Sequence, residues 1–494
     1  MSRTFGPLTI LIALAVGTHV FVVAAVRHHT GFIDTFAYQS LDSTEYYQIA
    51  QNVAARGIFS QATEPPYEPD TWRTPGYPLF LALIMKFGGD SETAVVIVQQ
   101  VLGVMNVWLV FLVARFYMSE RRAGVAAVIV LLEPYHLYYS LWLLTTTLFV
   151  TVLLLTWYAY ELAIRRGSAW RYGVLGVLCG SLVLVRPLAI LVPMVVLVGL
   201  FAFRARPESE HQRRTVSRVI RWCRMGTYAL AFTAVVMSWM ARNKIVAGHF
   251  ALSDQGGVVL AYFKAGEVEL WRQGRAADRY IETSLNPALA NEPHTVWDEI
   301  DRRLRDRLSD LPPELLTELS WRNLAQGNKT TADSFAVSAA LTDVGLSMMG
   351  SSPLATAACC VIRCGLILTF PLDQVLRPPT GSVNRRMRRL LQSSPYVGLL
   401  LLVVISMIRR IRWNSRGDDR ESSDGENRRG RLGLVQGVLV PVYFPLACTL
   451  ALLAATTPQL DPRFRVPMIP FLAFLAILPP KVRSKETNTS PPEA

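Results

Sequence analysis

The sequence predicts an all-α integral membrane protein with about ten transmembrane helices. Its 494 residues are 51% hydrophobic and only 18% charged, and the mean hydropathy is +0.29. A chain this apolar is unsuited to a single water-soluble core. A membrane-spanning helix needs about 20 mainly apolar residues, and good candidates are Pro7–Val26, Ala94–Tyr117, Gly124–Ser140, Leu143–Leu162, Met225–Ala241 and Leu434–Thr456. Shorter apolar segments follow Tyr172 and Leu188 and recur near Tyr396 and Val466.

The formal charge of +13 sets the expected orientation of these helices. Much of the basic excess lies in residues 204–224 and 409–431, between candidate spans. Lys and Arg concentrate in the cytoplasmic loops of membrane proteins and contact lipid headgroups. We therefore attribute the basic excess to the orientation of the helices and to membrane lipids, and expect no nucleic-acid partner. The first span lacks a small-residue cleavage site and is expected to remain as an anchor. The expected location is the plasma (inner) membrane.

This topology divides the chain into four regions. We expect an N-terminal transmembrane module (1–241) with a first external loop of short helices (27–92), a larger external helical loop (242–394), C-terminal transmembrane helices (395–480) and a disordered cytoplasmic tail (481–494).

A helical pattern supports a folded external loop. Val296, Ile300, Leu304 and Leu308 share one helical face. Pro353–Phe370 is apolar but carries Arg363 at its centre, and a span there would place the second basic segment outside. We therefore expect it to lie in the interface as an amphipathic helix.

Charged residues from separated segments converge on the predicted external face. They are Asp42, Arg186, Arg242–Asn243 and Arg463–Arg465. Several cations and one carboxylate near the interface suit an anionic lipid headgroup and a reactant that bears a hydroxyl or a phosphate.

Each of these residues also has a simpler interpretation. A lone interfacial arginine is more often a snorkelling anchor than a ligand. Asp42 and Glu45 have the spacing of a helix cap and its capping box. Arg186 is harder to explain in this way, because it interrupts an apolar run where an ion needs a partner or water. Glu133 is similar: it precedes Pro134 in an apolar helix, with His136 one turn along.

Five motifs occur in order along most of the chain. They are LDSTEYYQIAQNVAARGIFS, RTPGYPLFLALI, the Arg-Pro of LVLVRP, WMARNKIVAGHFALSDQGG and PRFRVPMIP. Together they resemble the GT-C superfamily of polyprenyl-phosphate-sugar-dependent glycosyltransferases, particularly bacterial members related to the protein mannosyltransferases and the lipid A aminoarabinose transferases.

The resemblance implies transfer of a sugar from a polyprenyl-phosphate donor to a lipid, glycan or protein acceptor on the extracytoplasmic face. Asp42 would be the catalytic carboxylate, as general base or as a ligand to a divalent metal such as Mg or Mn. Arg186, Arg463 and Arg465 would bind the donor phosphate. The expected pocket residues are Glu45, Tyr46, Tyr47, Arg73, Tyr77, Arg242 and Asn243.

One departure from the family pattern leaves the metal open. Relatives commonly have an acidic residue where this chain has Thr146, in LLTTTLFV. A hydroxyl is a weak metal ligand, so the site is metal-independent, or Glu133 or Glu45 takes the acidic role, or activity is lost. A transporter or flippase of a lipid-linked substrate and a non-catalytic scaffold with the same fold are the alternative functions.

Overall fold

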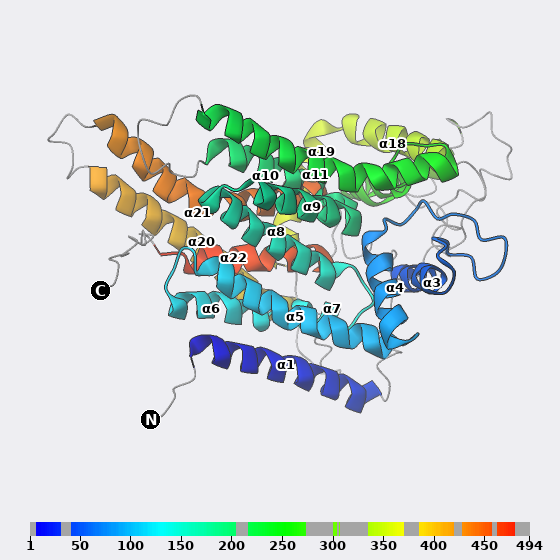
Figure 1. The fold of residues 1–494 in the computed structure, drawn as a ribbon, viewed down its shortest axis with the longest axis horizontal. Helices are drawn as coiled ribbons and strands as arrows, with labels where there is room; N and C mark the ends of the chain where they lie inside the picture. Colours follow the sequence, from blue (N-terminus) through cyan, green and yellow to red (C-terminus); the bar gives the residue numbers. More distant parts are fainter. Residues whose placement is uncertain are drawn as a thin grey trace.

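The computed structural model describes residues 6–30, 41–203, 216–272, 300–303, 306, 334–369, 385–418, 427–456 and 462–479. Within these ranges every regular element is a helix, which confirms the predicted all-α class. The long helices lie side by side, and the short helices α3 and α4 gather at one end of the bundle (Figure 1).

The amino-terminal half supplies most of the bundle. Its elements are α1 (Pro7–Thr30), α3 (Leu41–Arg56), α4 (Gly76–Gly88), α5 (Glu92–Ala114), α6 (Glu120–Leu131), α7 (Pro134–Tyr139), α8 (Thr146–Arg166), α9 (Ala169–Val185), η1 (Pro187–Ile190), α10 (Leu191–Ala202) and α11 (Val216–Ala247).

The predicted continuous span Gly124–Ser140 is wrong, because α6 ends at Leu131 and α7 begins at Pro134. Proline has no backbone N–H and disrupts a helix interior, so the chain breaks before it. The Glu133 carboxylate accepts a hydrogen bond from the His136 backbone N–H and caps the new helix.

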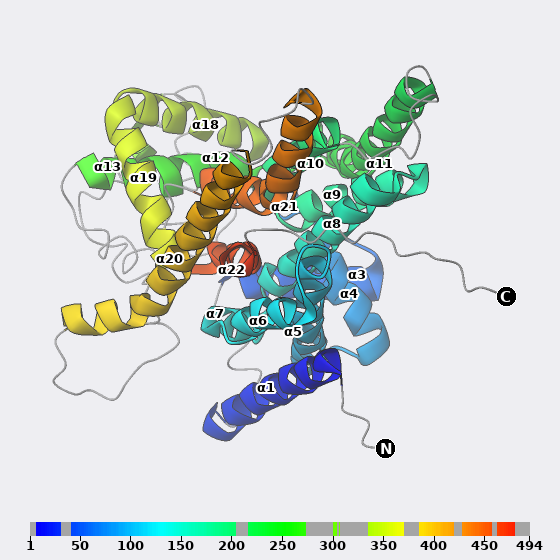
Figure 2. The same cartoon turned by 90° about the vertical axis from the view of Figure 1, so that its left-hand side faces the viewer.

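The remaining elements complete the bundle and build a helical lobe beside it, which carries α13, α18 and α19 (Figure 2). They are α12 (Gln255–Val258), η2 (Val259–Ala265), α13 (Gly266–Arg272), α18 (Ser334–Gly350), α19 (Pro353–Thr369), α20 (Arg385–Asp418), α21 (Asn427–Thr456), η4 (Pro462–Phe464), η5 (Val466–Met468) and α22 (Ile469–Ile477).

Of the predicted external helical face, only Ile300 is described. It is buried in a cluster with Tyr262 and Leu341. Val296, Leu304, Leu308 and the tail 481–494 lie outside the described residues.

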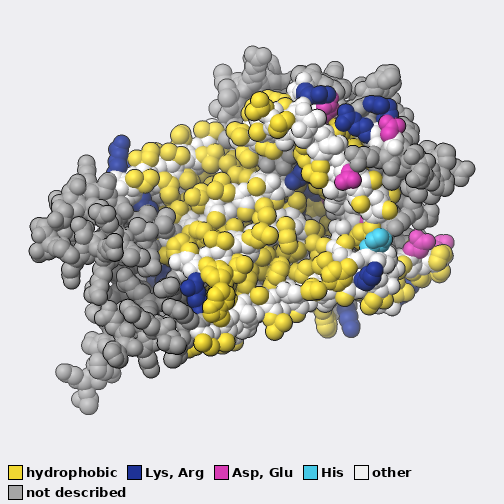
Figure 3. Space-filling model, turned by 90° about the horizontal axis from the view of Figure 1, so that it is seen from above, with side chains coloured by type: hydrophobic (Ala, Val, Ile, Leu, Met, Phe, Trp, Pro, Cys, Tyr) yellow, Lys and Arg dark blue, Asp and Glu magenta, His cyan; other side chains and the backbone are white. Residues whose placement is uncertain are grey.

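Among the described residues, four helices are long and apolar enough to cross a membrane: Leu8–His28, Glu92–Ala114, Thr146–Arg166 and Ser393–Arg412. A fifth is reached if Phe335–Gly350 and Pro353–Leu368, bent by 96°, form one broken span. Shorter apolar helices add to these within the described residues, so about ten spans remains a prediction. Figure 3 shows a broad hydrophobic surface, with charged side chains mostly toward one end.

The α19 helix turns its arginine inward. Arg363 is buried and ion-paired with Glu267 of α13, while Leu354, Val361 and Leu366 are exposed. This distribution matches an apolar environment outside the helix and a polar partner inside. The interfacial placement of α19 remains a prediction.

Aromatic packing joins the first and last parts of the chain. The Trp157 ring of α8 lies 5.8 Å from Phe444 of α21, and 5.1 and 5.0 Å from Phe471 and Phe474 of α22. Aromatic pairs at such distances add to the stabilisation from burial. These contacts hold α22, which follows the η4–η5 turn, against the middle of α8.

Glycines permit two close approaches that shape the functional end of the bundle. Gly176 and Gly180 of α9 contact the α11 segment around Phe232 so closely that a Cβ atom would collide with it. Such small-residue spacing favours close helix packing in membranes. A Cβ on Gly76 would meet the Val185 backbone at 2.6 Å. Gly76 therefore lets the start of α4 lie against the end of α9, beside Arg186.

Candidate active site

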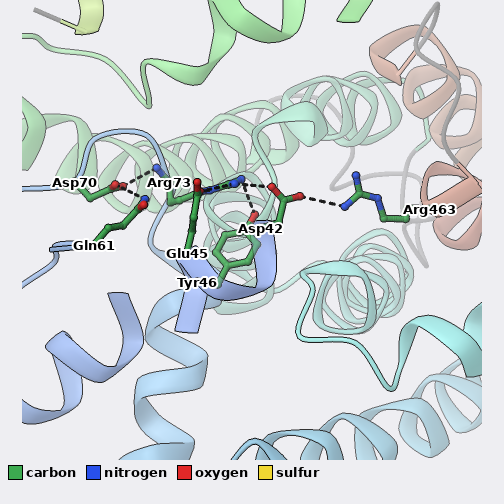
Figure 4. A network of polar contacts seen from close by, with 7 residues as sticks. All are labelled: Asp42, Glu45, Tyr46, Gln61, Asp70, Arg73 and Arg463. Atoms are coloured by element: carbon green, nitrogen blue, oxygen red, sulfur yellow. Dashed lines mark hydrogen bonds and ion pairs between the residues drawn. The ribbon is translucent and has the colours of Figure 1, made fainter. Parts of the chain in front are cut away.

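Arg73 lies at the centre of a charged cluster at the start of α3 (Figure 4). Its Nη2 lies 2.5 Å from Asp42 Oδ1, and its Nε donates to Glu45 Oε2 at 2.6 Å. The guanidinium also lies over the Tyr46 ring, 4.8 Å from its centroid. A planar guanidinium with several donors is well suited to joining two carboxylates. The side chains of Asp42 and Glu45 therefore meet at one cation.

Asp42 also contacts an arginine from the far end of the chain. Arg463 Nη1 of η4 donates to Asp42 Oδ2 at 3.1 Å, so both carboxylate oxygens contact a guanidinium. The Asp42 side chain remains 32% exposed and that of Arg463 24% exposed, whereas Arg73 is only 6% exposed. The cluster thus has a sealed side at Arg73 and an open side at Arg463.

The loop between α3 and α4 holds Arg73 in place. Asp70 Oδ1 accepts from the Arg73 backbone N–H at 2.8 Å, and Gln61 donates to Asp70 Oδ2 at 2.5 Å. Arg242 of α11 donates to the Asp70 carbonyl at 2.6 Å, and Asn243 donates to the Ala251 carbonyl at 2.8 Å. Arg242 and Asn243 therefore fix loop backbone near the cluster.

Arg186 and the tyrosines divide between the cluster and the surrounding core. The Arg186 guanidinium lies 5.4 Å from the Phe149 ring centroid and 5.7 Å from that of Phe464. Tyr46 packs edge-to-face on Tyr77 at 5.1 Å.

Two of the predicted pocket tyrosines point their hydroxyls at other partners. Tyr77 donates to Gln99 at 2.9 Å and Tyr47 donates to Asp90 at 2.6 Å. The structure therefore brings Tyr46 to Arg73, and places the hydroxyls of Tyr47 and Tyr77 in neighbouring interactions.

Arg465 lies in a second, buried cluster. It is 0% exposed, its Nη2 lies 3.7 Å from Glu133 Oε1, and its guanidinium stacks 3.5 Å from the Tyr396 ring centroid. The Tyr396 hydroxyl donates to the same Glu133 oxygen at 2.9 Å. Arg463 and Arg465, only two residues apart, therefore serve different carboxylates.

The electrostatics favour an ionised Asp42. Burial alone would raise the pKa of Asp42, but the charges and hydrogen bonds of Arg73 and then Arg463 outweigh it and lower the pKa well below its usual range. The pKa of Tyr46 is raised, first by burial, with an opposing contribution from Arg73. Arg186 also lowers the pKa of Tyr46, which places its charge in the same electrostatic environment.

The donor set does not suit a divalent metal. Among the described residues, no group of three or more His, Cys, Asp or Glu side chains could hold a metal ion. Asp42 and Glu45 share the Arg73 guanidinium, and Glu133 contacts Arg465, Tyr396 and the His136 N–H. A cation would have to displace arginines from these carboxylates.

Thr146, at the position where the resemblance predicts an acidic residue, offers little to a metal. The side chain is buried at the start of α8, and its hydroxyl has no hydrogen-bond partner within the part of the chain that is described.

Several contributors escape sequence reasoning. Gln61 and Asp70 hold the Arg73 backbone, and Tyr396 completes the Glu133 cluster. The signal for Asp70 is its position three residues before Arg73 in a Pro-rich loop, where Asp commonly accepts from nearby backbone N–H groups. Tyr396 gives no such signal, because it lies 263 residues from Glu133.

Comparison with solved structures finds two related matches. One is a crystal structure of ArnT from Cupriavidus metallidurans bound to undecaprenyl phosphate, with 10% identity and a TM-score of 0.38, covering 96% of this chain and 78% of that chain. The other is ArnT from the same organism in the apo state, with 11% identity and a TM-score of 0.35, covering 94% and 78%. Scores in this range are too low to transfer a site.

Comparison with protein families gives a more local result. No curated protein matches the chain. Residues 72–239 match the sequence profile of the family described as dolichyl-phosphate-mannose-protein mannosyltransferase. That segment begins beside Arg73, includes Arg186 and ends at Trp239, and the match confirms the predicted resemblance of this chain to the GT-C superfamily.

Proposed function

We propose that this protein is a membrane glycosyltransferase that moves a sugar from a polyprenyl-phosphate donor to an acceptor hydroxyl on the extracytoplasmic face. The observation that carries the proposal is the Asp42 carboxylate, held between Arg73 and Arg463 and still 32% exposed. The ionised carboxylate suits an acceptor hydroxyl, and the accessible guanidinium suits a donor phosphate. Because the two side chains are in contact, they would bring these reactants together. The family match over residues 72–239 supports the same class of reaction.

The donor phosphate would bind on the open side of the cluster. Arg463 is the more exposed of the two arginines on Asp42, and Arg186 lies against Phe464, the next residue along. Guanidinium groups bind phosphate oxygens with short, charge-assisted hydrogen bonds. Arg463 and Arg186 would therefore hold the phosphate, while Arg73 keeps Asp42 and Glu45 in position.

Transfer would proceed as a single displacement with inversion at the anomeric carbon. The acceptor oxygen forms a bond to that carbon as the bond to the phosphate oxygen breaks, and the acceptor proton passes to Asp42. Polyprenyl phosphate leaves with the bonding electron pair, and the arginines stabilise its added negative charge.

The loss of a cationic partner from Asp42 would couple proton transfer to donor binding. In the present geometry the low pKa makes the Asp42 carboxylate a weak base. When Arg463 turns from Asp42 to the donor phosphate, one lowering influence on that pKa is removed. Asp42 thus becomes more basic when a donor is bound, which favours proton transfer in the loaded site.

The proposed reaction needs no divalent metal at this site. Arg73 occupies the space between Asp42 and Glu45 at 2.5 and 2.6 Å from their oxygens. The positive charge that a metal would supply to the phosphate comes from arginine side chains, as it does at other phosphate sites.

Substitution of Asp42 tests this function. In proteoliposomes supplied with a polyprenyl-phosphate sugar and an acceptor extract, Asp42→Asn should lower the transfer rate by about 10³-fold or more, since it removes the proton acceptor. Asp90→Asn is the matched control: Asp90 accepts from Tyr47 and Gln51 of α3 and should leave the rate within about threefold.

Two outcomes would contradict the proposal. Full transfer by a folded Asp42→Asn variant would remove Asp42 from the mechanism. Movement of the intact donor across the bilayer by the wild type, with no sugar transfer to any acceptor, would instead favour a flippase.

A further inference from the structure

A second feature, outside the Asp42 cluster, is a pocket of about 430 Å³ between the end of α3, the loop that follows it, α4 and α11. Its lining includes Ile58, Phe59, Leu79, Trp239, Arg242 and Val246. Apart from Arg242, these side chains are apolar or aromatic. A pocket of this size and character accommodates part of an amphiphile.

Two aromatic rings and one cation form the polar end of this pocket. The Phe59 and Trp239 rings pack edge-to-face with centroids 4.9 Å apart. The Arg242 guanidinium lies 5.3 and 4.8 Å from these same centroids. Such stacking holds the guanidinium in place.

Among the described residues, the oxygens that accept hydrogen bonds from Arg242 are neutral, and the Asp70 carboxylate acts on it only through space. Its donors reach the Asp70 carbonyl at 2.6 Å, the Phe59 carbonyl at 3.3 Å and the Asn243 side-chain oxygen at 3.0 Å. Within the described ranges no carboxylate forms an ion pair with it, in contrast to Arg73 and Arg463. A half-buried cation with neutral partners favours an incoming anion.

An apolar row leads away from this cation. Leu79, Leu83 and Phe87 follow one another at four-residue spacing on α4 and are all exposed. Val246 and its neighbour Ile245 on α11 are exposed as well. In Figure 1, α4 runs across the ends of the long helices, so this row lies at the end of the bundle. Free phosphate would leave the row uncovered, whereas a lipid with acyl chains covers it.

We propose that this pocket binds an anionic phospholipid, with the headgroup phosphate at Arg242 and an acyl chain along Leu79, Leu83 and Phe87. Trp239, next to the phosphate, would lie at headgroup depth, where tryptophan is enriched in membrane proteins. The proposal stands independently of the transfer reaction.

The bound lipid would contact a residue that holds the loop carrying Arg73. Arg242 holds the carbonyl of Asp70, and the Asp70 carboxylate holds the Arg73 backbone N–H. A headgroup at Arg242 would therefore stabilise the loop that carries Arg73 without touching Asp42.

Fluorescence quenching by brominated lipids tests the proposal on the full chain in detergent. The contribution of Trp239 is the difference between the wild type and Trp239→Phe. Brominated phosphatidylglycerol should quench it at about tenfold lower concentration than brominated phosphatidylcholine, and Arg242→Gln should abolish the preference.

The matched control is Arg221→Gln. Arg221 is also on α11, lies over the Phe201 ring at 5.2 Å and donates to the Phe201 carbonyl at 2.7 Å. This control should keep the preference for phosphatidylglycerol at Trp239. Equal quenching by both lipids in the wild type, or a retained preference in Arg242→Gln, would overturn the proposal.

A second variant covers a folding failure of Arg242→Gln. Val246→Phe fills the pocket from an exposed helix position and should weaken quenching of Trp239 by phosphatidylglycerol at least fivefold. Quenching at wild-type strength in Val246→Phe would also overturn the proposal. These measurements need no sugar transfer, so they are separate from the test of Asp42.

Discussion

Two carboxylate–arginine pairs flank a single turn of the chain and have different surroundings. Arg463 contacts Asp42, with side chains 24% and 32% exposed, and Arg465 contacts Glu133, with side chains 0% and 4% exposed. A tyrosine ring lies against a guanidinium in both clusters: Tyr46 at Arg73, which also contacts Asp42, and Tyr396 at Arg465. The chemistry of the two clusters is similar, and their access to a ligand is not.

This difference separates binding from positioning. A partly exposed pair exchanges partners at lower cost than a buried pair, because water and ligands replace part of what is lost. A fully buried pair cannot lose one partner without leaving an uncompensated charge. We therefore expect Arg463 to exchange Asp42 for the proposed donor phosphate, and Arg465 to hold the η4–η5 turn in the place from which Arg463 reaches Asp42.

The largest expected effect concerns the buried pair. Arg465→Met leaves the Glu133 charge buried and should destabilise the protein by about 3–5 kcal/mol. Thermal unfolding of the detergent-solubilised protein measures this loss. Arg463→Met is the control and should cost less than about 1 kcal/mol. Equal destabilisation by both variants would remove the distinction between the pairs.

A double variant sharpens the same comparison. Arg465→Met combined with Glu133→Gln removes both charges and should recover part of the lost stability. If the double variant is as unstable as the sum of both single variants, the two side chains do not act as a pair.

The open pair should affect turnover instead. Arg463→Gln should lower kcat/KM for a polyprenyl-phosphate sugar by about 100-fold, as expected for loss of a group that stabilises a developing anion. Arg463→Lys keeps the charge but not the planar fork of donors, so its kcat/KM should lie between those of the wild type and Arg463→Gln. A variant with unchanged kcat/KM would show that Arg463 does not meet the phosphate.

Chelation should have a smaller effect. Because the carboxylates of the site are already paired with arginines, removal of divalent ions with EDTA should change the transfer rate by less than about twofold. Assays with EDTA and with added Mg²⁺ or Mn²⁺ measure this. A rate that falls with EDTA and returns with either metal would contradict the metal-free proposal.

The smallest expected effect is on pH dependence. The lowered pKa of Asp42 means that its carboxylate stabilises the fold above its ordinary pKa of about 3.9. That contribution is lost as the pH falls through the lower folded value. Between pH 5 and 8 Asp42 should stay ionised, so the transfer rate should not fall with Asp42 protonation in this range. In Arg463→Gln the pKa of Asp42 should rise, and the pH at which the rate begins to fall on the acid side should rise with it.

The overall helical fold was predictable because long apolar runs specify helices locally. The predicted spans Ala94–Tyr117 and Leu143–Leu162 agree with α5 and α8 to within a few residues at each end. Gly124–Ser140 was not predictable as one helix, because Pro134 breaks it and Glu133 caps the second part. Apolar composition alone does not carry this information.

The site was predictable only in part. Assigning loops to one side of the membrane grouped Asp42 with Arg463, 421 residues apart, but their contact depends on tertiary packing. The burial of Arg465 could not be read from the chain, because in a tight turn two residues at this spacing point in different directions. Asp70 accepts from a backbone N–H, so its signal in the sequence is its place in the loop, three residues before Arg73, and not a charge pattern.

The close contact of Gly176 and Gly180 with α11 has a mechanical consequence. Arg186 follows the end of α9, and Arg242 lies near the end of α11. The close packing of the two helices therefore fixes the positions of these two arginines relative to each other. A bulky residue at Gly176 would separate the two helices, and would therefore disturb the proposed donor-phosphate site and the proposed lipid site together.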